Sequence, residues 1–150
     1  MDKLKYKELD RLLKPLDSPV KIQEFLDSVP YNSTKRTLSP LLAMKERMAH
    51  CMDGGMFAAA ALRRLGYPPL IVDLSAENDD DHIIAVFREG GCWGAVAKSN
   101  TTVLRFREPV YRTLRELAMS YFDLYYNLNG QKTLRSYSRT IDLSKFDDHD

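Results

Sequence analysis

The feature that most constrains the fold is a run of small and apolar residues, 56–66, which closely follows Cys51 and the pair Gly54-Gly55. The run is apolar on most sides, which predicts a helix buried in the middle of a domain. In a helix interior the two glycines would cost roughly 1 kcal/mol each relative to alanine. In a first turn they instead allow close approach of backbone or substrate. Gly66 suits a left-handed C-cap. We therefore expect a buried central helix from Cys51 to Gly66.

The segment before this helix is predicted to be helical. Residues 3–14 place apolar side chains at three- and four-residue spacing, and Pro15 marks the end of that helix. Ser18-Pro19 and Ser39-Pro40 each supply an N-cap serine followed by a proline suited to the first helical position. Three helices are therefore expected before Cys51.

The pattern changes to strands after Gly66. Residues 70–74, 82–88 and 92–97 have strand composition, and Glu89-Gly90-Gly91 predicts a tight hairpin turn. Residues 103–107 alternate apolar and basic side chains, which predicts a further strand with one wet face.

The last part of the chain is predicted to return to a helix. It would begin at Pro109 and end at Asn129-Gly130, followed by a polar tail whose residues 147–150 are frayed. We thus expect one α+β domain over residues 1–150. Its parts are a helical N-terminal part (about 1–48), a core (about 49–107) and a C-terminal helix and tail (about 108–150).

Composition excludes several classes of function. The formal net charge is +1, from 22 basic and 21 acidic residues, so no field that gathers nucleic acid or anionic membrane is expected. No apolar run approaches the ~20 residues of a membrane helix, and the first residues lack the apolar core of a signal peptide. Two cysteines make no disulfide framework, which favours a cytoplasmic, reduced chain.

Cysteine at a helix start and histidine at a strand start are what a thiol nucleophile and its base require. A helix N-terminus lowers the pKa of a thiol, which favours Cys51 as the nucleophile. His50 is a poor partner because adjacent helical residues point about 100° apart, so His82 is the predicted base. The alternative is that Cys51 is a buried apolar side chain and His82 a structural histidine. Cys92, beside a turn glycine, is expected to be structural.

Two other uses of polar residues stay open at this point. Asp79, Asp80, Asp81 and His82 with Cys51 would be a zinc ligand set, but no ligand spacing supports it, and a solvated loop is expected. The five basic residues that follow the last core strand form either a charged sheet face or a site for an anionic ligand or partner. They are Lys98, Arg105, Arg107, Arg112 and Arg115. No phosphate-binding glycine motif occurs.

The order of these features resembles the transglutaminase-like branch of the papain-like cysteine enzymes, over residues 39–100. The resemblance rests on Cys51, on the helix end Ala-Leu-Arg-Arg-Leu-Gly-Tyr-Pro at 61–68, on His82 and on Trp93. It implies a central Cys-bearing helix packed on a small antiparallel sheet, with flanking helices. It also implies Cys51 as nucleophile and His82 as base.

The resemblance departs from the family at the third catalytic residue. The family carries an aspartate four residues after the tryptophan, to orient the histidine, and Ala97 stands there in this chain. Ser99 or Asn100 would substitute, and Asn100 is the predicted third residue because asparagine serves this role in papain-like relatives.

The predicted function is therefore a cysteine hydrolase or acyl transferase of the peptidase or amidase type. Its substrate would be a peptide or a small amide or ester, and no cofactor is implied because side chains and backbone supply the chemistry. The alternative is a catalytically inactive binding module for a protein or anionic ligand, which Ala97 and the basic cluster favour.

Overall fold

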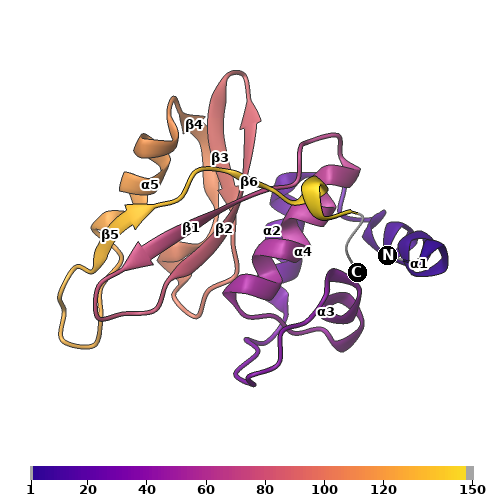
Figure 1. Cartoon of the computed structure of the whole chain (residues 1–150), viewed down its shortest axis with the longest axis horizontal. Coiled ribbons are helices and arrows are strands. Elements are labelled where there is room, and N and C mark those ends of the chain that lie inside the picture. The colour runs from indigo at the N-terminus through magenta and orange to yellow at the C-terminus, as the bar shows by residue number, and fades with distance from the viewer. Residues whose placement is uncertain (1, 148–150) are drawn as a thin grey trace.

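An antiparallel sheet separates two groups of helices in the computed structural model, which describes residues 2–147 (Figure 1). The second and fourth helices of the chain pack on one face of the sheet, the first and third helices pack against the fourth, and a single later helix covers the other face. The helices are α1 (Lys3–Leu13), α2 (Pro19–Ser28), α3 (Pro40–Glu46), α4 (Cys51–Arg64) and α5 (Leu114–Phe122). Two short 3-10 helices, η1 (Thr102–Leu104) and η2 (Leu143–Phe146), follow β3 and β6.

The strands form one sheet in the order β4-β3-β2-β1-β5, with β6 also paired to β1. They are β1 (Leu70–Ala76), β2 (His82–Glu89), β3 (Cys92–Val96), β4 (Arg107–Tyr111), β5 (Leu134–Tyr137) and β6 (Ile141–Asp142). Side chains alternate between the faces of a strand. In β2, Ile83 and Ala85 therefore pack in the core under α4, while Ile84 and Val86 pack in the core under α5.

The expected helix starts are confirmed, and their caps explain them. Ser18 Oγ accepts from the N–H of Lys21, and Ser39 Oγ accepts from the N–H of Leu42. These bonds satisfy N–H groups that have no partner within the helix. The end of α4 is also as expected, because Gly66 has a φ of +98°.

The glycine pair lets α4 lie close to the sheet. A Cβ on Gly55 would stand 2.6 Å from Cγ2 of Ile83, and one on Gly54 would collide with the Cβ of Lys98. Any side chain at either position would push the helix from the strands. The close approach expected for this pair is therefore an approach of helix to sheet.

The hairpin between β2 and β3 is confirmed in detail. Glu89 pairs with Cys92, and the two residues between them, Gly90 and Gly91, have φ of +59° and +79°. Positive φ at both central residues is the conformation that matches the twist of the flanking strands.

The later part of the chain differs from the prediction. The strand expected over 103–107 begins only at Arg107, and residues 102–104 form η1 instead. Pro109 lies inside β4 and does not begin a helix; α5 starts at Leu114, with Thr113 as its N-cap. A proline is tolerated there because β4 is an edge strand, where part of the N–H row has no partner strand.

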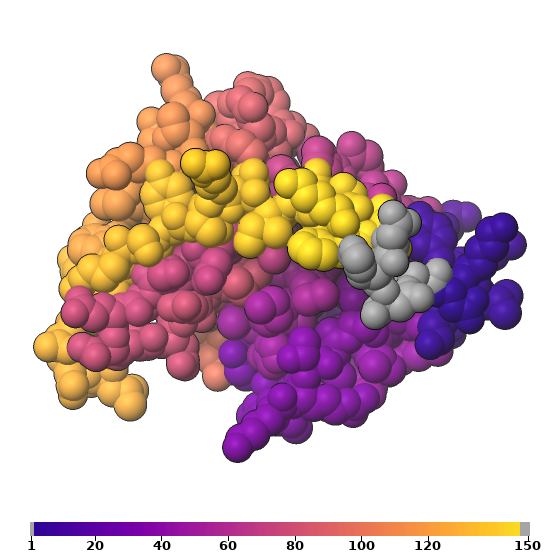
Figure 2. All heavy atoms as spheres, viewed as in Figure 1, coloured from indigo at the N-terminus to yellow at the C-terminus, as the bar shows by residue number. Residues whose placement is uncertain are grey.

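The polar tail is also more ordered than predicted. It adds β5 and β6 to the sheet, and it runs across the surface from β5 towards α1 (Figure 2). Asp147 forms a two-point ion pair with Arg63, with both N–O distances 2.7 Å. The remaining residues of the predicted frayed end, 148–150, lie outside the described residues. Within residues 2–147 no helix has the length and apolar character needed to cross a membrane.

Candidate active site

Cys51 is the first residue of α4, as predicted, and its thiol is half-buried against the start of β2. The Sγ atom lies 3.9 Å from the main-chain oxygen of Asp81, to which the S–H can donate. Burial raises the pKa of the Cys51 thiol; the main-chain N–H groups of Ile83 and Met52 offset part of that rise, and the charge of Asp80 adds to it. The N–H groups at the helix start do lower the pKa of the Cys51 thiol, as expected, but the net shift is upward because removing the thiolate from water outweighs them.

The N-terminus of α4 is held by a buried polar network. His50 is the N-cap, and its Nδ1 accepts from the N–H groups of Met52 and Asp53 at 3.1 and 3.3 Å. The carboxylate of Asp53, fully buried, accepts from the N–H of Leu38 at 2.7 Å and from Asn32 Nδ2 at 3.1 Å. These bonds tie the 31–38 segment to the first turn, so Cys51 sits on a rigid support.

His82 is buried on the other face of the sheet, with 4% of its surface exposed. Its Nε2 lies 2.7 Å from the main-chain oxygen of Leu104. A carbonyl oxygen only accepts, so Nε2 carries the hydrogen and Nδ1 carries the lone pair. The rings of Tyr121 and Tyr125 stand edge-on to the imidazole, at centroid distances of 6.4 and 6.5 Å. The imidazole is thus fixed in one orientation and one tautomer.

The charge state of His82 follows from this burial. Loss of water lowers the pKa of His82 to about 4, the bond to Leu104 opposes that fall, and the charge of Arg107 adds to it. At neutral pH the imidazole is therefore uncharged, with Nδ1 free to accept a proton.

The thiol of Cys51 lies at the start of β2, the strand whose first residue is His82. The sulfur lies against the main chain of Asp81 and Ile83, the two residues that flank His82 in sequence. No hydrogen bond joins Sγ to the imidazole among residues 2–147. The structure therefore brings the thiol beside the backbone that flanks His82, while the imidazole packs on the α5 face of the sheet.

The third predicted residue, Asn100, does not stand behind His82. Its side chain is exposed, and the oxygen that bonds Nε2 belongs to Leu104. Ser99 is also engaged elsewhere, because its Oγ accepts from the N–H of Thr101. The side-chain amide of Gln23 donates to the main-chain oxygen of Ala97 and accepts from its N–H. A main-chain carbonyl carries no side-chain signature, so no signal in the sequence pointed to Leu104.

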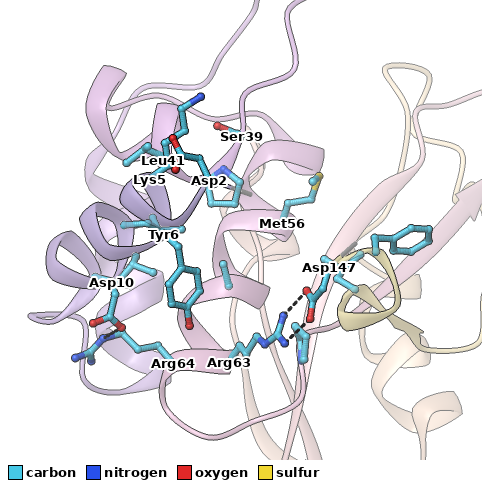
Figure 3. A pocket seen from close by; sticks show the side chains of 17 residues that line it. Asp2, Lys5, Tyr6, Asp10, Ser39, Leu41, Met56, Arg63, Arg64 and Asp147 are labelled. Atoms are coloured by element: carbon cyan, nitrogen blue, oxygen red, sulfur yellow. Dashed lines mark hydrogen bonds and ion pairs between the residues drawn. The ribbon is translucent and has the colours of Figure 1, made fainter. Parts of the chain in front are cut away.

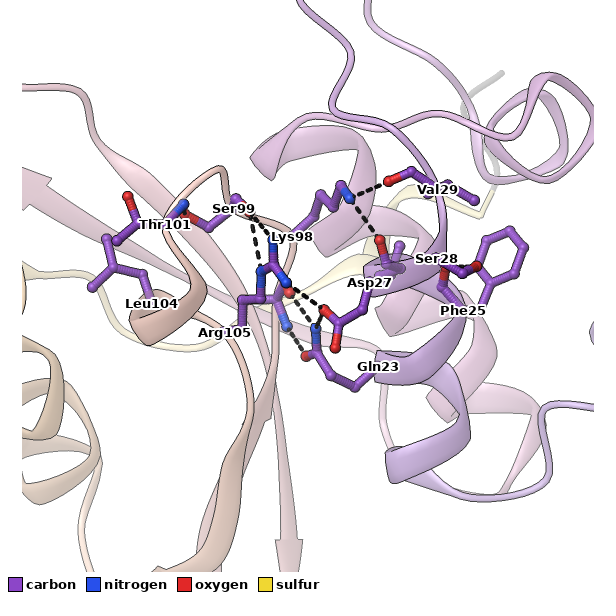
Figure 4. Close-up of polar contacts among 12 residues, drawn as sticks. Gln23, Phe25, Asp27, Ser28, Val29, Lys98, Ser99, Thr101, Leu104 and Arg105 are labelled. Atoms are coloured by element: carbon purple, nitrogen blue, oxygen red, sulfur yellow. Dashed lines mark hydrogen bonds and ion pairs between the residues drawn. The ribbon is translucent and has the colours of Figure 1, made fainter.

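The basic cluster is not an anion site at three of its five members, because Lys98, Arg105 and Arg107 are engaged by oxygens of the protein itself; Figure 4 shows the contacts of Lys98 and Arg105. Lys98 Nζ donates to the carbonyls of Leu26 and Val29 at the end of α2, each at 2.6 Å. Arg105 donates to the carbonyl of Ser99 at 3.1 and 2.9 Å.

Arg107 is engaged in the same way as Lys98 and Arg105. It donates to the carbonyls of Phe106 and Val103, and its guanidinium lies 3.9 Å from the ring centre of Tyr121. Arg105 also pairs with Asp27 of α2 at 3.2 Å, so its contacts, those of Lys98 and the Gln23 bonds to Ala97 fasten the loop that ends at Leu104 to α2. The cluster therefore holds in place the segment that carries the oxygen behind His82.

Two other features of the chain do not belong to this site. Among residues 2–147 no three His, Cys, Asp or Glu side chains stand close enough together to hold a metal ion, so the aspartates beside His82 do not form the zinc set considered above. A hollow of about 730 Å³ lies between α1 and the C-terminal part of α4, where Arg63 meets Asp147 (Figure 3). Neither Cys51 nor His82 lines it.

Comparison with known proteins gives a similarity in fold. No protein-family model matches the sequence, and no curated protein matches it. A candidate cysteine protease from Cytophaga hutchinsonii aligns with a TM-score of 0.52 and 16% identity, over 91% of this chain and 49% of that one. LapG from Legionella pneumophila, treated with EGTA, aligns with a TM-score of 0.44 and 13% identity, over 65% of this chain and 66% of that one.

The chain spans about half of the Cytophaga structure. The similarity concerns the fold, and it agrees with the topology described above, a Cys-bearing helix packed on a curled antiparallel sheet with flanking helices. The chain has the α+β papain-like, transglutaminase-like fold.

Proposed function

We propose that this protein is a cysteine hydrolase or acyl transferase that acts on an amide or ester through Cys51 and His82. The observation that carries the proposal is the buried bond from His82 Nε2 to the oxygen of Leu104, in a strand whose first residues also contact the thiol through their main chain. An orienting acceptor on the far ring nitrogen is what a general base needs in order to present its other nitrogen to a nucleophile. In this chain a main-chain carbonyl would take the role that a carboxylate or amide side chain has in the related enzymes.

In the proposed acylation step Sγ of Cys51 attacks the acyl carbon while Nδ1 of His82 takes the thiol proton. The bond from the acyl carbon to the leaving nitrogen or oxygen then breaks, and His82 returns the proton to the leaving group. The N–H of Cys51 would stabilise the oxyanion. Water, an amine or a thiol would complete the reaction by accepting the acyl group, and its proton would return through His82 to the sulfur.

The neutral carbonyl of Leu104 has a consequence for the resting site. A carboxylate would stabilise an imidazolium strongly, whereas a carbonyl does so weakly. Burial also disfavours both the thiolate and the imidazolium. The resting pair is therefore a neutral thiol and a neutral imidazole, and charge separates only when substrate is bound. Consistently, alkylation of Cys51 by iodoacetamide should rise with pH along a curve whose midpoint lies above the ordinary thiol value.

The test is to follow acylation of the protein by p-nitrophenyl acetate, and cleavage of a mixed synthetic peptide library, by mass spectrometry. We expect an acetyl group on Cys51, and no adduct in Cys51→Ala. His82→Gln should slow the reaction about 10²- to 10⁴-fold. Cys92→Ala is the matched control, because Cys92 is equally half-buried but lies at the hairpin. Equal rates in wild type and Cys51→Ala for both ester and peptides would refute the proposal.

The second candidate is a binding module that retains the fold without catalysis. It is favoured by the S–H contact to Asp81, which suits a protonated thiol, and by burial acting against charge on both partners. This candidate predicts that Cys51→Ala binds its partner as tightly as the wild type and that no ester acylates Cys51. The acylation experiment therefore separates the two candidates.

A further inference from the structure

We propose that the hydroxyl of Tyr31 is a second hydrogen-bond donor to the oxyanion, acting beside the main-chain N–H of Cys51. This inference rests on the proposed function, in which Sγ of Cys51 attacks an acyl carbon and the carbonyl oxygen becomes negatively charged. Tyr31 belongs to the loop between α2 and α3, far from Cys51 in sequence.

The main chain of Tyr31 runs alongside the segment that leads into α4. A parallel bridge joins Tyr31 to Ala49. The N–H of Ala49 donates to the oxygen of Pro30 at 3.3 Å, and the N–H of Asn32 donates to the oxygen of Ala49 at 2.9 Å. The side chain of Asn32 donates in turn to the buried carboxylate of Asp53, at 3.1 Å. The backbone on both sides of Tyr31 is therefore fixed relative to the first turn of α4.

The side chain of Tyr31 reaches the first residue of that turn. Burial raises the pKa of the Tyr31 hydroxyl, negative charge on the Cys51 sulfur adds to the rise, and the N–H of Cys51 opposes it as a hydrogen-bond donor. The charge of Asp80 raises the pKa of Tyr31 and that of Cys51 alike. The hydroxyl therefore lies beside both the sulfur and the N–H that would face the oxyanion.

The Tyr31 hydroxyl keeps its own hydrogen available. The hydroxyls of Tyr121 and Tyr125 donate to main-chain carbonyls, whereas no protein oxygen within residues 2–147 accepts from that of Tyr31. Tyr31 is half-buried, and its hydroxyl is open to solvent, because the one sealed side-chain polar atom without a partner in the described chain is Oδ1 of Asp73. An open hydroxyl that accepts from an N–H can still donate to a bound ligand.

The two donors become more effective as the reaction proceeds. When Sγ bonds to the acyl carbon, an electron pair of the C=O bond moves onto its oxygen, and it returns when the bond to the leaving group breaks. At rest the N–H of Cys51 faces a neutral hydroxyl oxygen. In the transition state this N–H and the O–H of Tyr31 both donate to the oxyanion, and hydrogen bonds to a charged oxygen are stronger than those between neutral groups. The gain belongs to the transition state, so it accelerates acylation.

The test compares two reactions of the same sulfur, in proteins that all carry Cys92→Ala. p-Nitrophenyl acetate is attacked at a carbonyl carbon, which creates an oxyanion. Methyl methanethiosulfonate is attacked at sulfur, which forms a methyl disulfide and releases methanesulfinate without an oxyanion. Tyr31→Phe should lower kcat/KM for the ester about 10²-fold and leave the rate of disulfide formation within about threefold. Tyr126→Phe, at an exposed tyrosine, is the matched control and should leave both rates unchanged.

Three results would overturn the inference. An equal fall of both rates in Tyr31→Phe would show that Tyr31 only positions the sulfur. An unchanged ester rate in Tyr31→Phe would show that its hydroxyl does not reach the oxyanion. If Cys51→Ala releases p-nitrophenol as fast as the wild type, the proposed function has failed and the inference falls with it. That third result is distinct from the first two, because it is seen without any change at Tyr31.

Discussion

The two faces of the sheet support the candidate site by different means. On one face α4 lies close to β2 because Gly54 and Gly55 have no side chains, and the contact is apolar. On the other face the contact is made by tyrosines whose hydroxyl groups bind main-chain oxygens. Tyr121 donates to the carbonyl of Arg105 at 2.7 Å, and Tyr125 donates to that of Asp80.

This difference matches what the proposed nucleophile, Cys51, and the proposed base, His82, would each need. A nucleophile on a helix has to be held at one position, and close packing of a helix against a sheet achieves that. An imidazole base also has to be held in one tautomer, and that requires a polar partner at a defined distance. The α4 face thus fixes the position of Cys51, and the α5 face fixes both the position and the tautomer of His82.

The largest expected effect on the α4 face comes from Asp53→Asn. The substitution keeps the shape but places an NH₂ group against a buried N–H donor, such as that of Leu38 or His50. We expect a loss of about 4 kcal/mol in the free energy of unfolding, since buried charged hydrogen bonds are costly to break. Urea unfolding measures it. Asp10→Asn is the control, because that carboxylate is exposed, and it should cost less than about 1 kcal/mol.

On the α5 face, His82 should make stability depend on pH. Its pKa in the folded protein is about 4, below the 6.5 of an unperturbed histidine. The unfolded chain therefore binds the proton first, so stability is full above pH 6.5 and falls as the pH drops towards 4. The loss is about 3 kcal/mol.

The measurement is urea unfolding between pH 4 and pH 7, in wild type and in His82→Gln. Subtracting the two curves removes the contribution of the carboxyl groups. Equal pH dependence in both proteins would show that the imidazole is not held neutral. Nitrogen NMR of His82 should independently show the hydrogen on Nε2.

Gly55→Ala should have a smaller effect on the free energy of unfolding, and the sign of that effect tests the contact between α4 and β2. Helix propensity alone would stabilise the protein by about 1 kcal/mol. The contact with Ile83 should reverse this, giving a net loss of about 2 kcal/mol. Ala60→Gly, on the less buried side of the same helix, should cost about 1 kcal/mol from propensity. A stabilised Gly55→Ala would contradict the close approach of α4 to β2.

The smallest effect should come from Tyr121→Phe. It removes one hydrogen bond and leaves the carbonyl of Arg105 without that donor, which should cost about 1 kcal/mol. Tyr126→Phe, at an exposed tyrosine, should leave the free energy of unfolding unchanged. Thermal unfolding resolves the difference, since 1 kcal/mol shifts Tm by about 2–4 °C in a domain of this size. Equal Tm values for Tyr121→Phe and Tyr126→Phe would contradict a stabilising role for the tyrosine hydrogen bonds on the α5 face.

The part of the chain up to the hairpin was predictable because its signals are local. Ser18-Pro19 and Ser39-Pro40 act through capping of the adjacent turn, and Gly90-Gly91 acts through its own backbone angles. The later part was predicted less well. Pro109 was assigned to a helix start because that is a common place for proline, but the edge position of β4 decided its role.

The candidate site also has one part that local sequence predicts and another that depends on tertiary structure. By itself the sequence determined that Cys51 opens the central helix and that His82 opens a strand, because both depend on interactions within a few residues. Only the tertiary structure decided which oxygen stands behind His82, since Leu104 acts through its main chain. It also decided that the thiol and the imidazole are neutral at rest. Burial depends on every segment that packs around a group, and no local pattern contains that information.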